Sequence, residues 1–435
     1  MLVGSGLLLL AGVVAAVLLT RHAEKQVVTT RAVSTQTATQ PATTSPPAPA
    51  PSGLAAAPLS QSAVRITWTG GGRAAIGLHG QPPTIWAGGG HAVVGGLSFT
   101  ATYDVTAGSR TTTVQPSPPT SVTASTGGGN LLLGGQPFFP ILLWGQCPFY
   151  DTLLAAGIDL FLNNPCGGLA SQVDALAGKG LTLGEAPGGS GEGVIGSYYP
   201  DEADAHGFTG ANLPQAQGVR FLTLSNHFYS AAAPLQAGRG MYPGLIAKAD
   251  VIGFDLYPLQ NWCRRDALPD VYSAQKELVA LAAGKPTFQW IETARMDCPV
   301  DEVTPQTVRA ESWLAITGGA RGLGFFPIGW TGEVSGGIAQ VGRDVQALGP
   351  AILAPEQPVT ADGPVKVAAR ALGGAFYVFA VNPTYAPAHV TISAPGLDGR
   401  PLQVLGESRS VTPANRAFAD DFAPLAVHLY VAAPA

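Results

Sequence analysis

The feature that most constrains the fold of this chain is an alternation of apolar and helix-like segments between residues 137 and 350. Eight short apolar runs occur there, and the clearest helical patterns between them are Leu169–Ala177, Val271–Ala283 and Gln306–Thr317. Fully apolar strands that alternate with helices are typical of a parallel sheet with helices on both faces. The runs are Phe138–Trp144, Ile158–Leu162, Leu181–Gly184, Val194–Tyr199, Arg220–Ser225, Val251–Tyr257, Thr287–Ile291 and Gly322–Ile328.

Eight strand and helix units in a stretch of this length predict an α/β fold, a (β/α)8 or TIM barrel, over residues 131–355. An open doubly wound sheet is the alternative, but no Gly-rich phosphate loop follows any of the runs. The segment His206–Gln217 has weak helical character. We therefore expect a loop-like connection after the fourth strand.

Two β-rich regions flank the predicted barrel. Between residues 61 and 130, short β-type runs are separated by glycines and show no helical period, which predicts a small antiparallel β module. From residue 356 to residue 435, strand patterns return with Gly, Pro and Asn-Pro turns between them. This second region predicts a C-terminal antiparallel β-sandwich.

The first residues have a membrane-targeting pattern. The run Leu2–Leu19 is apolar or small and carries no charge, so it can nearly span a membrane as a helix, whereas a buried core helix would show a polar face. No small-residue cleavage site follows it, so we expect residues 1–26 to be an uncleaved anchor, with a cleaved signal as the alternative. Residues 27–60 are rich in Pro, Thr, Ser and Ala and are typical of a stalk.

The side of the membrane on which the body lies is open to two interpretations. Arg21, Lys25 and Arg31 follow the apolar run, and under the positive-inside rule they favour a cytoplasmic body. The stalk-like composition and a plausible pairing of the cysteines favour the opposite side, and basic residues ahead of Met1 would reverse the rule. We expect an extracytoplasmic, membrane-anchored protein, or a secreted one if the segment is cleaved.

The charge and cysteine composition exclude several partner classes. Only 12% of the residues are charged, 23 basic against 28 acidic, and no basic block or stripe occurs. This argues against a nucleic-acid partner. The chain has four cysteines but no Cys-x-x-Cys and no His-Glu-x-x-His sequence. We therefore expect no metal site and no cofactor.

The four cysteines fall after neighbouring predicted strands. Cys147 follows the first strand and Cys166 the second, while Cys263 follows the sixth and Cys298 the seventh. We predict disulfides Cys147–Cys166 and Cys263–Cys298, with four free buried thiols as the alternative.

Polar and aromatic residues follow the predicted strands at the end where a barrel places its active site. Acids, amides and aromatic rings together suit a sugar, because the rings stack on its apolar face and the polar groups bond its hydroxyls. The candidate substrate-binding residues are Trp144, Asn163, Asp201, His227, Asp255, Tyr257 and Trp330, and the candidate catalytic residues are Glu202 and Glu292.

Three short motifs resemble those of the retaining (β/α)8-barrel glycoside hydrolases. Gly135-Gln-Pro-Phe-Phe-Pro-Ile141 is similar to their first-strand entry, Tyr198-Tyr-Pro-Asp-Glu-Ala203 to their fourth-strand acid/base motif, and Lys285-Pro-Thr-Phe-Gln-Trp-Ile-Glu292 to their seventh-strand nucleophile motif. The resemblance implies that Glu202 is the acid/base and Glu292 the nucleophile. The chain departs from the commonest fourth-strand motif, Asn-Glu, because Asp201 precedes Glu202.

The chemistry of glycoside cleavage also calls for such a pair, one protonated carboxyl and one carboxylate facing each other across the substrate. Each acid has a plainer interpretation as well. Asp201 could N-cap a short helix, with Glu202 as first-turn charge. Glu292 ends an apolar strand, where a carboxylate needs a partner or a task.

We predict from the sequence a glycoside hydrolase that acts on an extracytoplasmic oligo- or polysaccharide by a retaining double displacement. The alternative from a different class is a non-catalytic glycan-binding or cell-surface protein on a degenerate glycosidase barrel. A third interpretation, a structural envelope protein, predicts no aromatic-lined cleft.

Overall fold

The computed structural model describes residues 52–298, 303–330 and 332–435, all within one compact unit that spans residues 48–435. The predicted anchor, residues 1–26, and the predicted stalk up to residue 51 lie outside the described residues. Within the described ranges, no helix has both the length and the apolar character needed to cross a membrane.

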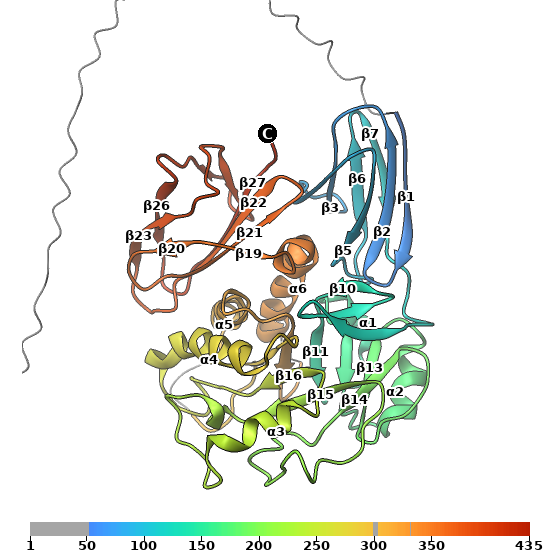
Figure 1. The fold of residues 1–435 in the computed structure, drawn as a ribbon, viewed down its shortest axis with the longest axis vertical. Helices are drawn as coiled ribbons and strands as arrows, with labels where there is room; N and C mark the ends of the chain where they lie inside the picture. Colours follow the sequence, from blue (N-terminus) through green and yellow to red (C-terminus); the bar gives the residue numbers. More distant parts are fainter. Residues whose placement is uncertain (1–51, 299–302, 331) are drawn as a thin grey trace, which may run out of the picture. The chain divides into compact units, whose positions relative to one another are not determined.

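The centre of the fold is an eight-stranded parallel barrel, as predicted (Figure 1). Adjacent strands follow the order β16-β15-β14-β13-β12-β11-β18-β17, and parallel bridges Ile252–Thr287 and Asp255–Trp290 join the two ends. The strands are β11 (Ile141–Trp144), β12 (Leu160–Leu162), β13 (Leu181–Glu185), β14 (Val194–Tyr198), β15 (Val219–Leu224), β16 (Val251–Phe254), β17 (Gln289–Glu292) and β18 (Leu323–Phe326).

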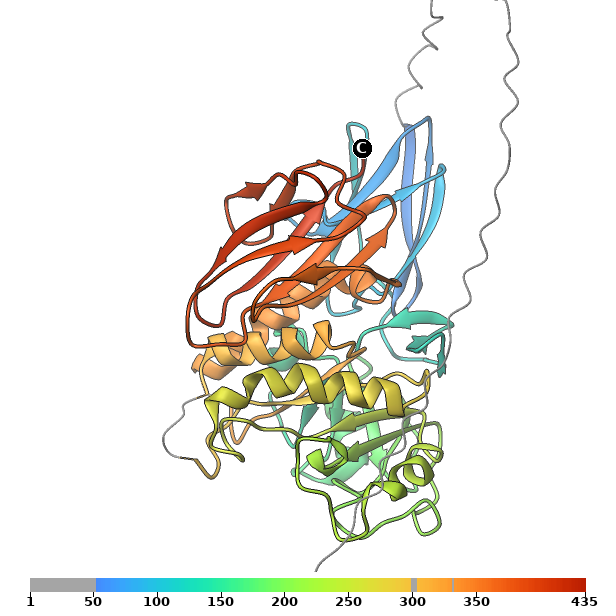
Figure 2. The same cartoon turned by 60° about the vertical axis from the view of Figure 1, so that its left-hand side comes forward.

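Helices of unequal length cover the barrel. They are α1 (Tyr150–Ala155), α2 (Gly168–Leu176), α3 (Tyr242–Ile246), α4 (Leu268–Leu281), α5 (Pro305–Thr317) and α6 (Gly332–Ile352), with 3-10 turns at Asn226–Phe228, Arg239–Met241 and Arg265–Ala267. The three helices predicted from the sequence are confirmed as α2, α4 and α5. Figures 1 and 2 show α4 and α5 side by side on the outside of the barrel.

The connection between β14 and β15 contains turns and no helix within the described residues, as the weak pattern predicted. By contrast, α5 begins at a strong start signal. The Thr304 hydroxyl accepts the Thr307 backbone N–H, Thr307 bonds back to Thr304, and Pro305 occupies the first helical turn. Such caps satisfy N–H groups that have no partner within the helix.

The N-terminal β module consists of antiparallel sheets β1-β2-β5 and β4-β3-β6-β7. Its strands are β1 (Ser52–Ser60), β2 (Ala63–Thr69), β3 (Arg73–Leu78), β4 (Ile85–Gly88), β5 (His91–Gly95), β6 (Tyr103–Ala107) and β7 (Arg110–Val114). The predicted end of the stalk at residue 60 is corrected, because β1 pairs with β2 along nearly its whole length. Its Ala- and Pro-rich composition hid a strand that packs Leu54 and Ala56 against the core.

A third sheet crosses the predicted boundary between module and barrel at residue 130. It contains β8 (Ala124–Gly127), β9 (Asn130–Leu133) and β10 (Gln136–Phe138) in the order β10-β9-β8. Leu131, Leu133 and Phe138 pack into one apolar cluster with barrel residues such as Leu160 and Phe221. This sheet therefore belongs with the barrel, whose interior it extends, and the boundary is not a linker.

The C-terminal region is the predicted antiparallel sandwich, with sheets β19-β21-β22-β27-β24-β25 and β20-β23-β26. Its strands are β19 (Glu356–Gln357), β20 (Thr360–Ala361), β21 (Lys366–Leu372), β22 (Ala375–Val381), β23 (Ala388–Ser393), β24 (Leu402–Val404), β25 (Ser410–Val411), β26 (Ala417–Phe422) and β27 (Val427–Ala432). The Trp313 ring of α5 lies 5.1 Å from that of Phe379 in β22, so the sandwich covers a barrel helix.

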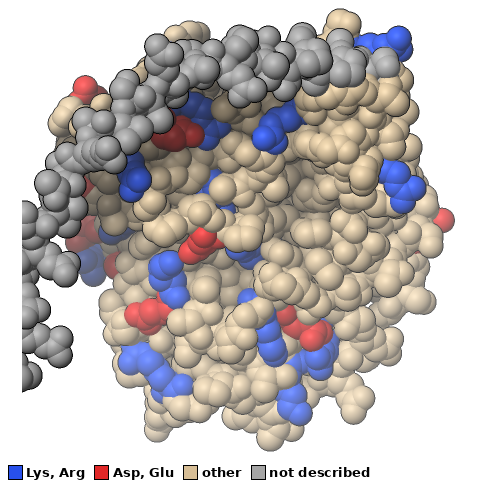
Figure 3. Space-filling model, turned by 45° about the horizontal axis from the view of Figure 1, so that its top comes forward, with Lys and Arg blue, Asp and Glu red and all other residues tan. Residues whose placement is uncertain are grey.

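Charge is sparse on the face shown in Figure 3. There, Lys and Arg side chains are interspersed with Asp and Glu side chains over a mostly uncharged surface. No block of one sign gathers on the part of that face that the picture shows.

Candidate active site

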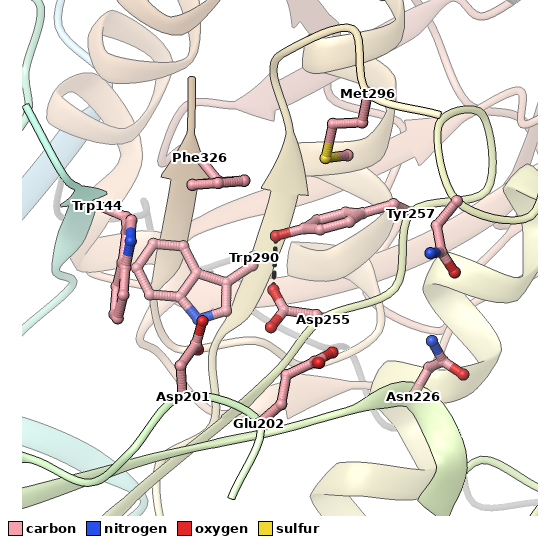
Figure 4. Close-up of a pocket in the computed structure, with 10 residues that line it drawn as sticks. Trp144, Asp201, Glu202, Asn226, Asp255, Tyr257, Trp290, Met296 and Phe326 are labelled. Atoms are coloured by element: carbon pink, nitrogen blue, oxygen red, sulfur yellow. Dashed lines mark hydrogen bonds between the residues drawn. The ribbon is translucent and has the colours of Figure 1, made fainter. Parts of the chain in front are cut away.

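A pocket of about 240 Å³ opens at the C-terminal ends of the barrel strands, where such folds place their active sites (Figure 4). It combines three carboxyl groups with four aromatic side chains, two amides and a thioether. The residues that line it are Trp144, Asp201, Glu202, Asn226, Asp255, Tyr257, Asn261, Trp290, Met296 and Phe326.

Five of the nine residues predicted from the sequence line this pocket, and four do not. The five are Trp144, Asp201, Glu202, Asp255 and Tyr257. Asn163 lines a second hollow beside it. His227, Trp330 and Glu292 are absent from the lining of both.

Glu202 sits in the turn that follows β14. Its φ is +41°, a left-handed conformation that costs a non-glycine residue about 1–3 kcal/mol and is concentrated at functional sites. The alternative role of Asp201 as a helix N-cap does not occur, because residues 201–207 form turns. His206 Nδ1 bonds the backbone oxygens of Asp201 and Glu202 at 2.9 and 3.2 Å, which fixes this turn.

A buried carboxylate, Asp204, ties the same turn to its neighbours. It accepts hydrogen bonds from the Ser225 backbone N–H at 2.8 Å, the Ser225 hydroxyl at 2.6 Å and the Tyr242 hydroxyl at 3.0 Å. Three hydrogen bonds hold this carboxyl group in one orientation. Asp204 thereby joins the turn to β15 and α3 and places a fixed negative charge behind Glu202.

Asp255 follows β16 and is 9% exposed. The Tyr257 hydroxyl donates a hydrogen bond of 2.6 Å to its carboxyl, and Figure 4 shows the carboxyl groups of Asp255 and Glu202 pointing into the same pocket. Burial raises the pKa of Asp255 well above its usual range, and the charges of Asp201, Glu202 and Asp204 raise it further. Asp255 is therefore held in its protonated form to higher pH than an ordinary aspartate.

The pKa of Glu202 is also raised, first by burial and then by the charges of Asp201 and Asp204. The charges of His206 and His227 act in the opposite direction. The cluster thus contains two carboxyls in different surroundings, one deeply buried and one partly open. Unequal environments of this kind separate an acid from a base within one site.

Aromatic rings form the opposite wall. The Trp144 ring lies 5.9 Å from that of Trp290, and the Trp290 indole N–H donates to Thr223 Oγ1 at 3.0 Å. A Cβ on Gly324 of the neighbouring strand β18 would lie 2.3 Å from a Trp290 ring carbon. A glycine at that position therefore makes room for the indole.

Glu292 ends β17 but is fully buried beside the pocket. Its carboxyl oxygens accept the backbone N–H groups of Leu259 at 2.9 Å and Gln260 at 2.8 Å. The carboxyl of Glu311, on α5, lies against it, and both burial and the charge of Glu292 raise the pKa of Glu311 well above its usual range. In this structure Glu292 holds the loop after β16.

The loop that Glu292 holds carries part of the pocket wall. Gln260 Oε1 accepts the backbone N–H of Met296 at 2.8 Å, so the loops after β16 and β17 are tied together. Asn261 and Met296, one from each loop, line the pocket. A carboxylate at the end of an apolar strand needs a partner, and for Glu292 that partner is a pair of backbone N–H groups.

The other two predicted residues make contacts of their own. His227 Nδ1 bonds the Ala233 carbonyl at 2.6 Å, and Trp330 packs on the main apolar cluster. Five lining residues were not among the predicted substrate-binding or catalytic residues, namely Asn226, Asn261, Trp290, Met296 and Phe326. Strand alternation could have found Trp290, which lies two residues before Glu292, whereas Asn261 and Met296 sit on irregular loops.

Both predicted disulfides are confirmed. Cys147–Cys166 joins the segments after β11 and β12, with Cα atoms 6.2 Å apart, and Cys263–Cys298 joins those after β16 and β17, with Cα atoms 5.4 Å apart. Each connects neighbouring loops on the face that holds the pocket.

No protein-family model matches the chain, and no curated protein sequence does. Several solved structures of glycoside hydrolases are similar in part. A GH27 β-L-arabinopyranosidase from Geobacillus stearothermophilus shares 13% identity over 50% of this chain and 59% of its own, with a TM-score of 0.36. A GH30 endoxylanase from Clostridium papyrosolvens shares 12% identity over 72% and 99%, with a TM-score of 0.40.

A β-glucuronidase from Ruminococcus gnavus shares 10% identity over 65% of this chain and 65% of its own, with a TM-score of 0.35. This chain thus spans less than two thirds of the arabinopyranosidase and of the glucuronidase. At TM-scores below 0.5, the similarities are too weak to carry an inference about activity, which has to come from the site itself.

Proposed function

We propose that this protein is a glycoside hydrolase that acts on an extracytoplasmic glycan. The observation that carries the proposal is the pocket that the carboxyls of Glu202 and Asp255 share with the indoles of Trp144 and Trp290. Glycoside cleavage uses one protonated carboxyl and one carboxylate. An aromatic wall can bind the apolar face of the sugar.

The pairing that we favour is Glu202 with Asp255. The raised pKa of Asp255 suits a general acid at the leaving oxygen, and the partly open Glu202 suits the carboxylate at the anomeric carbon. The similarity of the sequence motifs to those of retaining barrel glycoside hydrolases implies a different pair, in which Glu202 is the acid/base and Glu292 is the nucleophile. That alternative requires Glu292 to leave the two backbone N–H groups that it now accepts.

The proposed reaction is a retaining double displacement. An oxygen of Glu202 bonds the anomeric carbon while the bond to the leaving oxygen breaks, and the proton of Asp255 passes to that oxygen. Water then attacks the anomeric carbon, gives its proton to Asp255 and releases Glu202. Trp144 and Trp290 hold the sugar ring by its apolar face.

The extracytoplasmic location is part of the proposal and rests on different residues. The two disulfides are typical of proteins from oxidising compartments. The apolar run Leu2–Leu19 favours attachment to a membrane, and a cleaved signal peptide is the alternative.

The test is hydrolysis of a panel of 4-nitrophenyl α- and β-glycosides of glucose, galactose, mannose, xylose, arabinose and glucuronic acid by the full chain. We expect release of nitrophenol by the wild type, little by Glu202→Gln, and wild-type rates from Glu192→Gln, an exposed acid outside the pocket. NMR of the first-formed sugar should show the anomeric configuration of the substrate. Equal rates from wild type and Glu202→Gln would refute catalysis at this site.

A non-catalytic glycan-binding protein is the second candidate, and the burial of Glu292 favours it. It predicts that the wild type binds sugars, detected by NMR line broadening of the panel, without releasing nitrophenol from any member.

A further inference from the structure

A second hollow, of about 330 Å³, lies on the same face of the barrel beside the main pocket. Its walls come from the C-terminal ends of β12, β13 and β14 and from the start of α2. The residues that line it are Asn163, Asn164, Gly168, Leu169, Gln172, Leu183, Gly184, Glu185, Gly188 and Tyr198.

An aromatic contact connects the walls of the two spaces. Tyr198 lines the second hollow, and its ring lies 5.5 Å from that of Trp144, which lines the main pocket. Burial raises the pKa of Tyr198, and the charges of Glu185, in the second hollow, and of Asp201, in the main pocket, raise it further. Its hydroxyl therefore lies within electrostatic reach of both spaces, which are neighbours along the mouth of the barrel.

The polar side chains in the second hollow are of two kinds. The side chain of Asn164 forms hydrogen bonds with the backbone of Cys166 and Gly168. The side chain of Gln172 forms hydrogen bonds with the hydroxyls of Thr182 and Tyr150. The exposed side chains of Asn163 and Glu185 form no hydrogen bond or ion pair with any described residue. Their donors and acceptors are thus available to a ligand.

The backbone holds these two groups in place. Asn163 has a φ of +54°, directly after β12, and the nearby Cys147–Cys166 disulfide joins its loop to the loop after β11. The floor is built around Gly188, whose φ is +102° and whose added Cβ would lie 2.4 Å from Ser197 Oγ. The disulfide and the close packing at Gly188 therefore constrain the backbone around the hollow.

We propose that this hollow binds a second sugar unit of an oligosaccharide whose neighbouring unit occupies the main pocket. The amide of Asn163 and the carboxylate of Glu185 bond its hydroxyls, while Leu169 and Leu183 face its apolar side. The inference rests on the proposed function and makes the preferred substrate at least a disaccharide.

The experiment compares two substrates of the full chain, the 4-nitrophenyl monosaccharide that it accepts and the disaccharide of the same sugar. For Asn163→Ala and Glu185→Gln we expect KM for the disaccharide to rise about tenfold and KM for the nitrophenyl monosaccharide to change less, because the nitrophenyl group carries no hydroxyl for these side chains to bond. Glu192→Gln is the matched control and should alter neither. Unchanged disaccharide kinetics, or an equal loss on both substrates, would overturn the subsite.

Failure of hydrolysis and failure of the subsite can be told apart by binding. If the wild type cleaves nothing, saturation-transfer NMR with cellobiose, maltose, xylobiose and mannobiose replaces the kinetic readout. Weaker disaccharide binding by Glu185→Gln, with monosaccharide binding unchanged, would support the subsite although the proposed activity had failed. Equal disaccharide binding by wild type, Asn163→Ala and Glu185→Gln would reject it.

Discussion

At the scale of single residues, the chemistry of the pocket depends on how strongly each carboxyl is desolvated. Asp255 and Glu202 share one space, yet Asp255 is nearly inaccessible and Glu202 is partly open. The charge of Asp204, fixed by three hydrogen bonds, acts on both. A difference in protonation between two neighbouring acids therefore follows from burial and from where the surrounding charges lie.

The charge of Asp201 gives the first prediction. An acid that must be protonated loses activity as pH rises through its pKa, and Asp201 contributes to raising the pKa of Asp255. Asp201→Asn should therefore move the high-pH limb of the kcat/KM profile to lower pH. The measurement is the profile of both proteins on the same nitrophenyl glycoside, and an unmoved limb would contradict Asp255 as the acid.

The buried pair Glu292 and Glu311 gives a prediction about stability. Glu311 keeps its proton in the folded protein but ionises near pH 4.3 when unfolded, so the folded state binds more protons above about pH 4.3. The free energy of unfolding then falls as pH rises from about 4.3 toward the raised pKa of Glu311. Glu311→Gln removes the titrating carboxyl and with it this dependence.

The difference in Tm between Glu311→Gln and wild type should therefore grow in favour of the variant as the pH rises from 5 to 7. Thermal unfolding of both proteins in matched buffers measures this difference. A Tm difference that stays constant over this range would mean that Glu311 is ionised in the folded protein.

At the scale of elements, the loops after the strands shape the pocket, and the disulfides hold them. The Cys263–Cys298 bridge spans 35 residues of sequence and joins the loops that carry Asn261 and Met296. Replacing both cysteines with serine should lower the free energy of unfolding by about 2–4 kcal/mol, chiefly by freeing the unfolded chain. Urea unfolding of the two proteins measures this, and equal midpoints would show that the bridge contributes nothing.

The barrel could be predicted from the sequence because all eight strands are mostly apolar and are separated at regular intervals, a pattern set by burial on both faces. The strand β1 could not, because its Ala- and Pro-rich sequence matches a linker as well as a strand. For the candidate site, the strand ends indicated Glu202 and Asp255, both of which line the pocket. They could not indicate that the N–H groups of Leu259 and Gln260 would hold the carboxyl of Glu292, since those donors lie 33 and 32 residues earlier in the chain.

At the scale of the whole molecule, the barrel and the β regions share contacts. The Tyr377 hydroxyl of the sandwich donates to the Thr84 carbonyl of the N-terminal module at 2.8 Å, and the Arg73 guanidinium donates to the Gly373 carbonyl at 2.7 Å. Trp313 of α5 is buried against Phe379. The sandwich is thus part of the packing that protects the barrel helices.

Removing residues 356–435 should therefore expose α5 and destabilise the barrel rather than release an independent domain. We expect the full chain to unfold in one calorimetric transition and the truncated chain to bind a hydrophobic dye at 25 °C. Two separate transitions in the full chain, with a truncated chain that stays folded, would show that the sandwich is independent.

The central claim is that Glu202 and Asp255 form the catalytic pair, and one assay tests it directly. Initial rates on the best glycoside should fall about 10²- to 10⁴-fold in Glu202→Gln and in Asp255→Asn. Glu292→Gln should keep most of its activity but lose about 1–3 kcal/mol of stability, because a buried N–H group loses its acceptor. A folded Glu292→Gln without activity, beside an active Asp255→Asn, would contradict the account and restore Glu292 as the nucleophile.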